Sequence, residues 1–253
     1  MINLQILNKI ALKKVSEYTD LEMLDATINA PYAKNIVKPA LLETMKQNNF
    51  NEEVIERLHV LYKNRKVYFG WGRGKTTPSE LKKYTLKFLN YYGYDTSNIT
   101  PRGLKTFMQM YNLGIDCSGF VYYVLDKTLQ SVNISLAKEL NFQYEKTPIT
   151  KANTSKFNNV SIKIQPKDIK PLDLIFIQDD SQTVYHMGLI LFYDDIPYVA
   201  QSSPFTIPSG VTSFPLQIIN NLPKFKINLT FGTPFENLYT QNKIFFARLR
   251  ILD

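Results

Sequence analysis

The residues that could carry chemistry are concentrated in positions 114–123, GIDCSGFVYY. Cys117 is the only cysteine among 253 residues and lies between an acidic residue and two small residues. Apolar side chains from Phe120 to Leu125 share one helical stripe, which predicts a buried helix beginning near Cys117. Asp116 is a favoured N-cap residue, because its side chain can accept hydrogen bonds from first-turn N–H groups. The pattern therefore places a thiol at the amino-terminal end of a helix.

A thiol in this position is a candidate nucleophile. The N–H groups of a first helical turn favour thiolate over thiol at Cys117, and Gly119 is expected to keep that turn open to a substrate. The carboxylate of Asp116 opposes a second nearby negative charge, unless backbone donors engage it. The alternative is that Cys117 is a small buried hydrophobic residue, as free cysteines often are.

A nucleophilic cysteine needs a base, and the chain contains two histidines. His186 lies in a strand pattern, VYHMGLILFY, in which alternation puts Gly188 and Ile190 on the same face and Gly188 leaves room beside the imidazole. His59 lies mid-helix at the edge of an apolar face, where we expect a structural role. An imidazole on a strand, facing the start of a packed helix, is the papain-like way to activate a cysteine. The alternative for His186 is a core histidine bonded to a backbone carbonyl.

The sequence indicates no cofactor and no metal. One cysteine and two histidines do not form a recognisable zinc ligand set.

The elements expected around these residues are helical first and strand-like afterwards. Helical spacing and polar–apolar patterns predict helices over 21–30, 37–47, 51–63, 79–93 and 101–112, with an aromatic and glycine-rich loop at 67–75. Short β-rich runs follow the cysteine segment at 172–178, 186–193, 196–203 and 243–252. This order predicts an α+β fold with an antiparallel sheet. The proline-rich stretch from 202 to 240 is expected to be a functional loop rather than part of a core sheet.

The charge is uneven along the chain. Of the net +8, residues 1–110 contribute 17 Lys and Arg against 10 Asp and Glu. A basic first half could contact an anionic polymer or surface, although a solvated lysine-rich face is the simpler interpretation. No basic helix or zinc-finger spacing favours nucleic acid. No transmembrane run and no secretory signal is recognisable, so a cytoplasmic protein and one released by another route both remain open.

Four motifs resemble the NlpC-type papain-like cysteine peptidases, which cut bacterial cell-wall peptides. The family usually has a Y-x-x-G-G-like loop, a D/N-C-S-G-F/L-V helix start, a P-G-D-L-x-F-F strand and an H-V-G-I-Y strand. Here the corresponding segments are 68–72, 116–121, 171–177 and 186–191, in the same order. The resemblance extends over about residues 51–253. It implies a papain-like peptidase domain over 51–253 and a helical amino-terminal extension over 1–50.

The resemblance also implies roles for individual residues. Cys117 becomes the nucleophile and His186 the general base, and a third polar residue on the next strand orients the imidazole. Strict alignment puts Ala200 there, so a one-residue offset to Gln201 is needed. The substrate-binding residues are expected to be Tyr68, Asp116 and Ser118: Tyr68 and Ser118 border the thiolate and help to hold substrate or oxyanion.

Three features depart from the family pattern. Leu172 replaces the usual glycine before Asp173, and two segments, near 73–112 and 202–240, are enlarged and are expected to flank the cleft. The resemblance implies hydrolysis of an amide bond in a peptidoglycan stem peptide through a thioester intermediate. Alternatives are a protein deamidase, an acyltransferase on a permuted fold with His59 as base, and a non-catalytic binding or structural module.

Overall fold

The computed structural model describes residues 2–33, 74–204, 206, 209–225 and 241–253. Its helices, in chain order, are α1 (Leu4–Thr19), α4 (Pro78–Tyr91), α5 (Pro101–Met110), α6 (Cys117–Gln130), α7 (Leu136–Glu139) and α8 (Thr154–Asn159). Short 3-10 turns lie at η2 (Pro148–Lys151), η3 (Pro166–Asp168) and η4 (Arg250–Leu252). The predicted helices at 37–47 and 51–63 lie outside the described residues.

Seven strands form one antiparallel sheet in the order β3-β9-β4-β5-β6-β7-β8. They are β3 (Ser161–Ile164), β4 (Leu174–Gln178), β5 (Val184–Tyr193), β6 (Ile196–Ser203), β7 (Gly210–Ile219), β8 (Leu222–Phe225) and β9 (Ile244–Leu249). The predicted strands at 172–178, 186–193, 196–203 and 243–252 correspond to β4, β5, β6 and β9. The expected α+β class with an antiparallel sheet is confirmed.

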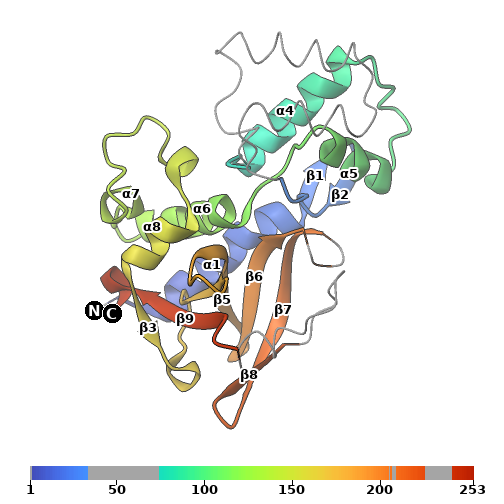
Figure 1. The fold of residues 1–253 in the computed structure, drawn as a ribbon. Coiled ribbons are helices and arrows are strands. Elements are labelled where there is room, and N and C mark those ends of the chain that lie inside the picture. Colours follow the sequence, from blue (N-terminus) through green and yellow to red (C-terminus); the bar gives the residue numbers. More distant parts are fainter. Residues whose placement is uncertain (1, 34–73, 205, 207–208, 226–240) are drawn as a thin grey trace.

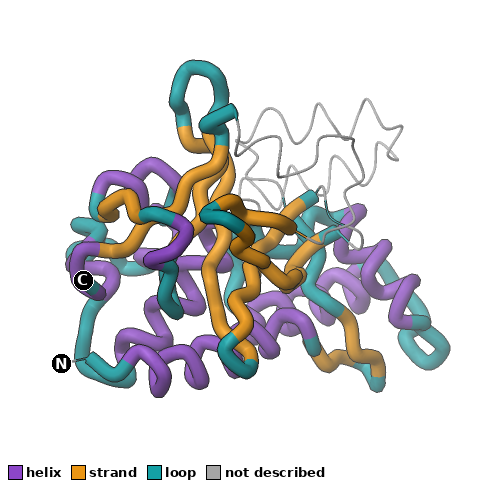
Figure 2. The backbone as a smooth tube through the Cα atoms, turned by 90° about the horizontal axis from the view of Figure 1, so that it is seen from below, coloured by secondary structure: helices purple, strands orange, loops and turns teal. Residues whose placement is uncertain are grey.

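Helices α1 and α6 pack on one face of this sheet (Figures 1 and 2). The larger hydrophobic cluster fills this layer and includes Leu7 of α1, Phe120 of α6 and Leu189 of β5. A second cluster on the other face of the strands includes Ile175, Ile190 and Val199. Helix α6 is thus fixed against the central strands, and the position of its first residue, Cys117, follows from that packing.

Helices α4 and α5 lie together at one end of the sheet, next to a small hairpin of β1 (Leu21–Met23) and β2 (Ala26–Ile28) (Figure 1). The helix predicted over 21–30 is therefore wrong. Leu24 and Asp25 both have positive φ, 51° and 57°, and form a two-residue turn that reverses the chain. Apolar residues alternate with a period of two on both strands, but over three residues this alternation is not distinguishable from helical spacing.

The proline-rich region is also different from the prediction, because part of it belongs to the sheet. Strand β7 pairs with β6 and β8 within the segment that was expected to be a loop. Pro223 is on β8, the edge strand. Pro215 is at the last residue pair with β6, before pairing with β8 begins at Leu216. Both prolines therefore occupy places where a missing N–H is tolerated.

The turn before β4 explains one departure from the family pattern. Leu172 has a φ of 71°, in the left-handed region where glycine is usual and where other residues are strained by roughly 1–2 kcal/mol. Its side chain is fully buried in the main core, and its N–H donates to the carbonyl of Ile190 on β5. Burial and this hydrogen bond hold the leucine in a conformation that a glycine would adopt without strain.

Among the described helices, none combines the length and apolar character that crossing a bilayer requires.

Candidate active site

Helix α6 begins at Cys117 because Asp116 caps it. The Asp116 side chain accepts a hydrogen bond from the N–H of Gly119 at 2.6 Å, and its backbone is extended, with φ of −86° and ψ of 172°. Behind the first turn, Phe120, Val121 and Val124 are fully buried. The predicted helix start is therefore present, with its thiol at the first helical position.

Two segments far away in the sequence run beside the residues that precede Cys117. Ile115 bridges to Tyr32 on one side and to Lys75 on the other. Its N–H donates to the carbonyl of Pro31 at 3.1 Å, and the N–H of Asp116 donates to the carbonyl of Gly74 at 2.8 Å. Gly74 has a φ of 64°, and a Cβ there would lie 2.6 Å from the carbonyl oxygen of Ala33. These backbone contacts bring Tyr32 and Lys75 to the cysteine.

Lys75 is buried and bonded to both neighbours of Cys117. Its Nζ lies 2.6 Å from each carboxylate oxygen of Asp116 and 2.6 Å from the Oγ of Ser118. Ser118 Oγ also donates to the carbonyl of Ala152 at 3.3 Å. A Cβ on Gly119 would lie 2.6 Å from the Gly74 carbonyl oxygen and 3.0 Å from the Lys75 side chain. Gly119 therefore makes room for the Gly74–Lys75 segment, and not for a substrate as the sequence had suggested.

Cys117 is 7% exposed, and its sulfur lies close enough to β5 for the backbone N–H of Met187 to lower the pKa of the thiol. Burial, followed by the charge of Asp116, raises the pKa of the thiol to about 12, while Lys75 and the N–H groups of Met187 and Ser118 oppose that rise. Burial thus outweighs the helix N-terminus, and the resting group is a thiol rather than the expected thiolate.

His186 lies on β5, directly before Met187, and is 8% exposed. Its Nε2 is 2.6 Å from the Oε1 of Gln201 on β6. Because the amide oxygen can only accept, Nε2 carries the proton and Nδ1 is left as the free base. Burial lowers the pKa of His186, and the bond to Gln201 partly offsets this shift. The imidazole is therefore neutral at neutral pH and keeps one tautomer.

Gly188 does not leave space beside the imidazole, contrary to the prediction from strand alternation. A Cβ there would lie 3.0 Å from Val199 and 3.1 Å from Ile175, side chains of the second hydrophobic cluster. The ladder between β4 and β5 contains a bulge, since Ile177 pairs with His186 and Gln178 pairs with Val184. Gly188 instead allows close packing of three neighbouring strands.

The predicted site residues differ in how far the geometry supports their expected roles. Gln201, and not Ala200, is bonded to His186, so the one-residue offset agrees with the geometry. Asp116 and Ser118 are each 4% exposed and point to Lys75, and their role in substrate binding stays a prediction. Tyr68 and His59 lie outside the described residues.

Sequence reasoning missed Tyr32 and Lys75. Tyr32 is close enough for the charges of Cys117 and Asp116 to raise the pKa of its hydroxyl, after the larger effect of burial. Lys75 had one indirect signal, because a buried Asp116 carboxylate beside a thiol needs a compensating cation. No signal marked Tyr32, which reaches the site only through the backbone pairing of Tyr32 with Ile115.

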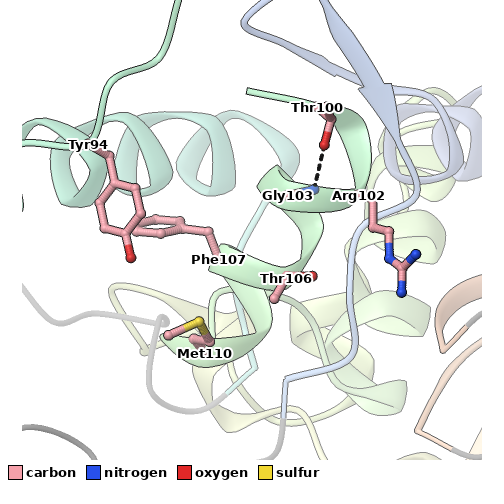
Figure 3. Close-up of a pocket in the computed structure, with 7 residues that line it drawn as sticks. All are labelled: Tyr94, Thr100, Arg102, Gly103, Thr106, Phe107 and Met110. Atoms are coloured by element: carbon pink, nitrogen blue, oxygen red, sulfur yellow. Dashed lines mark hydrogen bonds between the residues drawn. The ribbon is translucent and has the colours of Figure 1, made fainter. Parts of the chain in front are cut away.

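A separate surface pocket of about 410 Å³ lies along α5, lined by Tyr94, Thr100, Arg102, Gly103, Thr106, Phe107 and Met110 (Figure 3). Neither Cys117 nor His186 contributes to it. Within the described ranges, no group of three or more His, Cys, Asp or Glu residues could hold a metal ion.

Comparison with known proteins gives one match. No curated protein and no solved structure matches the chain. The model of the NlpC/P60 family matches residues 90–208, a segment that contains Cys117, His186 and Gln201 and three of the four sequence motifs. This family generally comprises cysteine peptidases and amidases of the cell-wall type, whose substrates contain peptides. Over residues 90–208 the chain is similar to the NlpC/P60 family.

Proposed function

We propose that this protein hydrolyses amide bonds in peptidoglycan stem peptides, with Cys117 as nucleophile, His186 as general base and Gln201 as the residue that orients the imidazole. One observation carries the proposal. The backbone N–H of Met187 lies close enough to the Cys117 sulfur to lower the pKa of the thiol, and the next residue back, His186, is bonded through Nε2 to Gln201. This arrangement supports a nucleophile on α6 and a base with its orienting group on β5 and β6, the strands that pack against that helix.

The first half of the reaction forms an acyl-enzyme. Nδ1 of His186 takes the proton from the Cys117 thiol as the sulfur attacks the substrate carbonyl, so the C–S bond forms and the carbonyl electron pair moves to oxygen. The N–H of Gly119 is taken by Asp116, and that of Phe120 by the Asp116 carbonyl. The N–H of Ser118 already acts on the sulfur, so the first-turn donor left for the oxyanion is the N–H of Cys117. The C–N bond then breaks, and the amine leaves with the proton from His186.

The second half releases the acid. Nδ1 of His186 takes a proton from water, the hydroxyl adds to the thioester, and the C–S bond breaks as the sulfur recovers the proton. This route does not need a resting ion pair, because the proton moves as the nucleophile attacks. It is consistent with a thiol whose pKa is raised and an imidazole whose pKa is lowered.

The test replaces Cys117 by Ala and by Ser and measures muropeptide release from purified sacculi. We expect a loss of at least about a thousandfold with unchanged unfolding temperature, because the thiol forms the covalent intermediate. Gln130→Ala, an exposed change on the same helix, is the matched control and should keep full activity. Release by the Cys117→Ala variant at the wild-type rate would remove the mechanism.

The proposal also specifies which bond is cut. We place it at a γ-D-glutamyl linkage or a cross-bridge, and mass spectrometry of products from defined muropeptides decides between them. The same experiment separates wall hydrolysis from a deamidase or an acyltransferase, whose products would retain the peptide chain or carry a transferred acyl group. Contact of anionic wall polymer with the basic first half, which includes exposed Lys83 and Lys87, belongs to the same proposal.

A further inference from the structure

Lys75 is an unusual lysine, since only 1% of its surface is exposed. Lysines are almost never fully buried unless they are paired. An ammonium group has three donors, and here they are directed at three acceptors: Oδ1 and Oδ2 of Asp116 and Oγ of Ser118, each at 2.6 Å. The cation is thus completely coordinated by residues of this chain.

The acceptors of Lys75 are the two residues that flank Cys117 in the sequence. The backbone is fixed at the same place, because Lys75 bridges to Ile115 and the Gly74 carbonyl accepts the N–H of Asp116 at 2.8 Å. Two residues further on, Thr77 caps α4 in a reciprocal arrangement with Glu80. The lysine is therefore held by its own segment as well as by its ion pair.

We propose that Lys75 is a positioning residue for Cys117: its buried cation fixes the residues on both sides of the sulfur and neutralises the carboxylate that would otherwise oppose a thiolate there. This inference rests on the proposed role of Cys117 as the nucleophile. Lys75 itself touches neither the substrate carbonyl nor the imidazole in the mechanism above.

The charges around the sulfur support this role. Among the residues that the structure describes, the ionisable groups that interact with Cys117 are Asp116 on its own element, Lys75 before α4 and Tyr32 from the other flanking segment. Asp116 raises the pKa of the thiol, and Lys75 lowers it. In a site this deeply buried, charge interactions are screened far less than in water. Among the residues that the structure describes, this lysine is the neighbouring cation that favours a negative sulfur.

A purely structural role explains the pair less well. Replacing a buried ion pair by apolar residues is often neutral or stabilising, so a buried pair is weak evidence for stability. The family pattern also allows asparagine at position 116, which would cap the helix without a charge. The charge of Asp116 and the burial of Lys75 are both explained if the cation acts on the sulfur between its two acceptors.

The decisive experiment compares the Asp116→Asn variant with the Asp116→Asn/Lys75→Met double variant. Iodoacetamide labelling of Cys117, the only cysteine, is followed by mass spectrometry across pH, below the unfolding temperature of each protein. Neither variant leaves a carboxylate beside the sulfur, so the difference between them isolates the lysine charge. We expect the single variant to label at least tenfold faster at one pH, the effect of one pKa unit. Equal labelling rates would overturn the proposal.

The Lys75→Met variant gives the second measurement. It leaves the Asp116 carboxylate without its cation, and we expect labelling at least tenfold slower than in the wild type, whereas Lys75→Arg, which keeps the charge, should restore most of the rate. Lys87→Met, an exposed change on α4, is the matched control and should label as the wild type does. A pH profile that is the same in Lys75→Met and wild type contradicts the inference. Labelling does not depend on hydrolysis, so failure of the proposed function would appear separately, as activity in Cys117→Ala.

Discussion

The described part of the protein contains two buried carboxylate–cation pairs, and they are built differently. At the sheet, Arg248 of β9 binds Asp173, the residue before β4, with Nε–Oδ1 and Nη2–Oδ2 distances of 2.8 and 2.9 Å. At the active site, Lys75 binds Asp116, the residue before α6, at 2.6 Å to both oxygens. Burial raises the pKa of both aspartates, and in each pair the partner cation opposes the shift.

The difference lies in what each cation does with its remaining donors. The guanidinium of Arg248 also reaches the carbonyl of Asp168 at 2.7 Å and so ties η3 to the sheet. Its planar fork matches a carboxylate in one fixed geometry. The ammonium of Lys75 instead reaches Ser118, next to the sulfur. The arginine pair therefore joins elements of the scaffold, whereas the lysine pair surrounds a reactive group.

The largest expected effect comes from breaking the scaffold pair. Arg248→Met leaves the Asp173 carboxylate buried without a cation, and we expect the free energy of unfolding to fall by about 3–5 kcal/mol. Urea unfolding followed by circular dichroism measures this loss. The proton-transfer geometry at Cys117 should be unchanged in the fraction that remains folded, because Arg248 contacts none of the proposed catalytic residues.

Removal of both charges is the control for that prediction. In Asp173→Asn/Arg248→Met no charge is left unpaired, and the introduced amide oxygen can still accept the N–H of Lys170, which donates to Asp173 at 2.6 Å in the wild type. We expect the double variant to recover at least about 1 kcal/mol relative to Arg248→Met. A loss in Arg248→Met below about 1 kcal/mol would mean that leaving the Asp173 carboxylate without its cation costs little at this site, and the expected contribution of the pair would be wrong.

The pH dependence of hydrolysis gives the second, smaller contrast. The imidazole of His186 is a base only when neutral, so the rate should fall as pH falls through its pKa. Because burial lowers that pKa from its ordinary value of 6.5, the midpoint of the acid limb should lie below pH 6.5. Initial rates on a defined muropeptide between pH 4 and 9 measure it.

The two pairs should separate in this measurement. Arg248→Met, assayed well below its unfolding temperature, should keep the wild-type acid limb and shape of the profile. Lys75→Met should instead lose rate across the whole pH range, because the uncompensated Asp116 carboxylate opposes the negative charge that develops on the sulfur as it loses its proton. An acid limb above pH 6.5 in the wild type, or one that shifts in Arg248→Met, would contradict this division of roles.

Local features of the sequence predict some parts of the fold and of the site, whereas contacts between distant segments decide the rest. The start of α6 and strands β4, β5, β6 and β9 were predictable, because capping, periodicity and strand alternation are local. Cys117 and His186 followed from their residue types and from the motifs around them. Gln201 needed the resemblance and an offset of one residue, which the bond to His186 now explains.

The remaining features depend on contacts between distant segments. Lys75 lies 41 residues before Asp116, and nothing local distinguishes it from the other 29 lysine and arginine residues of the chain. The β1–β2 hairpin turns at Leu24 and Asp25 without the usual Asn-Gly or Asp-Gly signal. The β7–β8 hairpin is not predictable from the local sequence, because its prolines disfavour a strand except at the edge of a sheet or at the end of a ladder. In each case tertiary packing outweighed the local preference.

An exposed ion pair provides the smallest expected effect and tests whether burial, and not distance, decides how much an ion pair contributes to stability. Lys243 and Asp180 approach to 3.0 Å, little further than the buried pairs, but the Asp180 side chain is 90% exposed. Water already solvates both groups, so Lys243→Ala should change the free energy of unfolding by less than about 0.5 kcal/mol. Urea unfolding at low and high salt, beside Arg248→Met, gives the measurement. If Lys243→Ala lowered the free energy of unfolding as much as Arg248→Met does, proximity alone would stabilise ion pairs in this protein, and burial would not explain the effect of Arg248→Met.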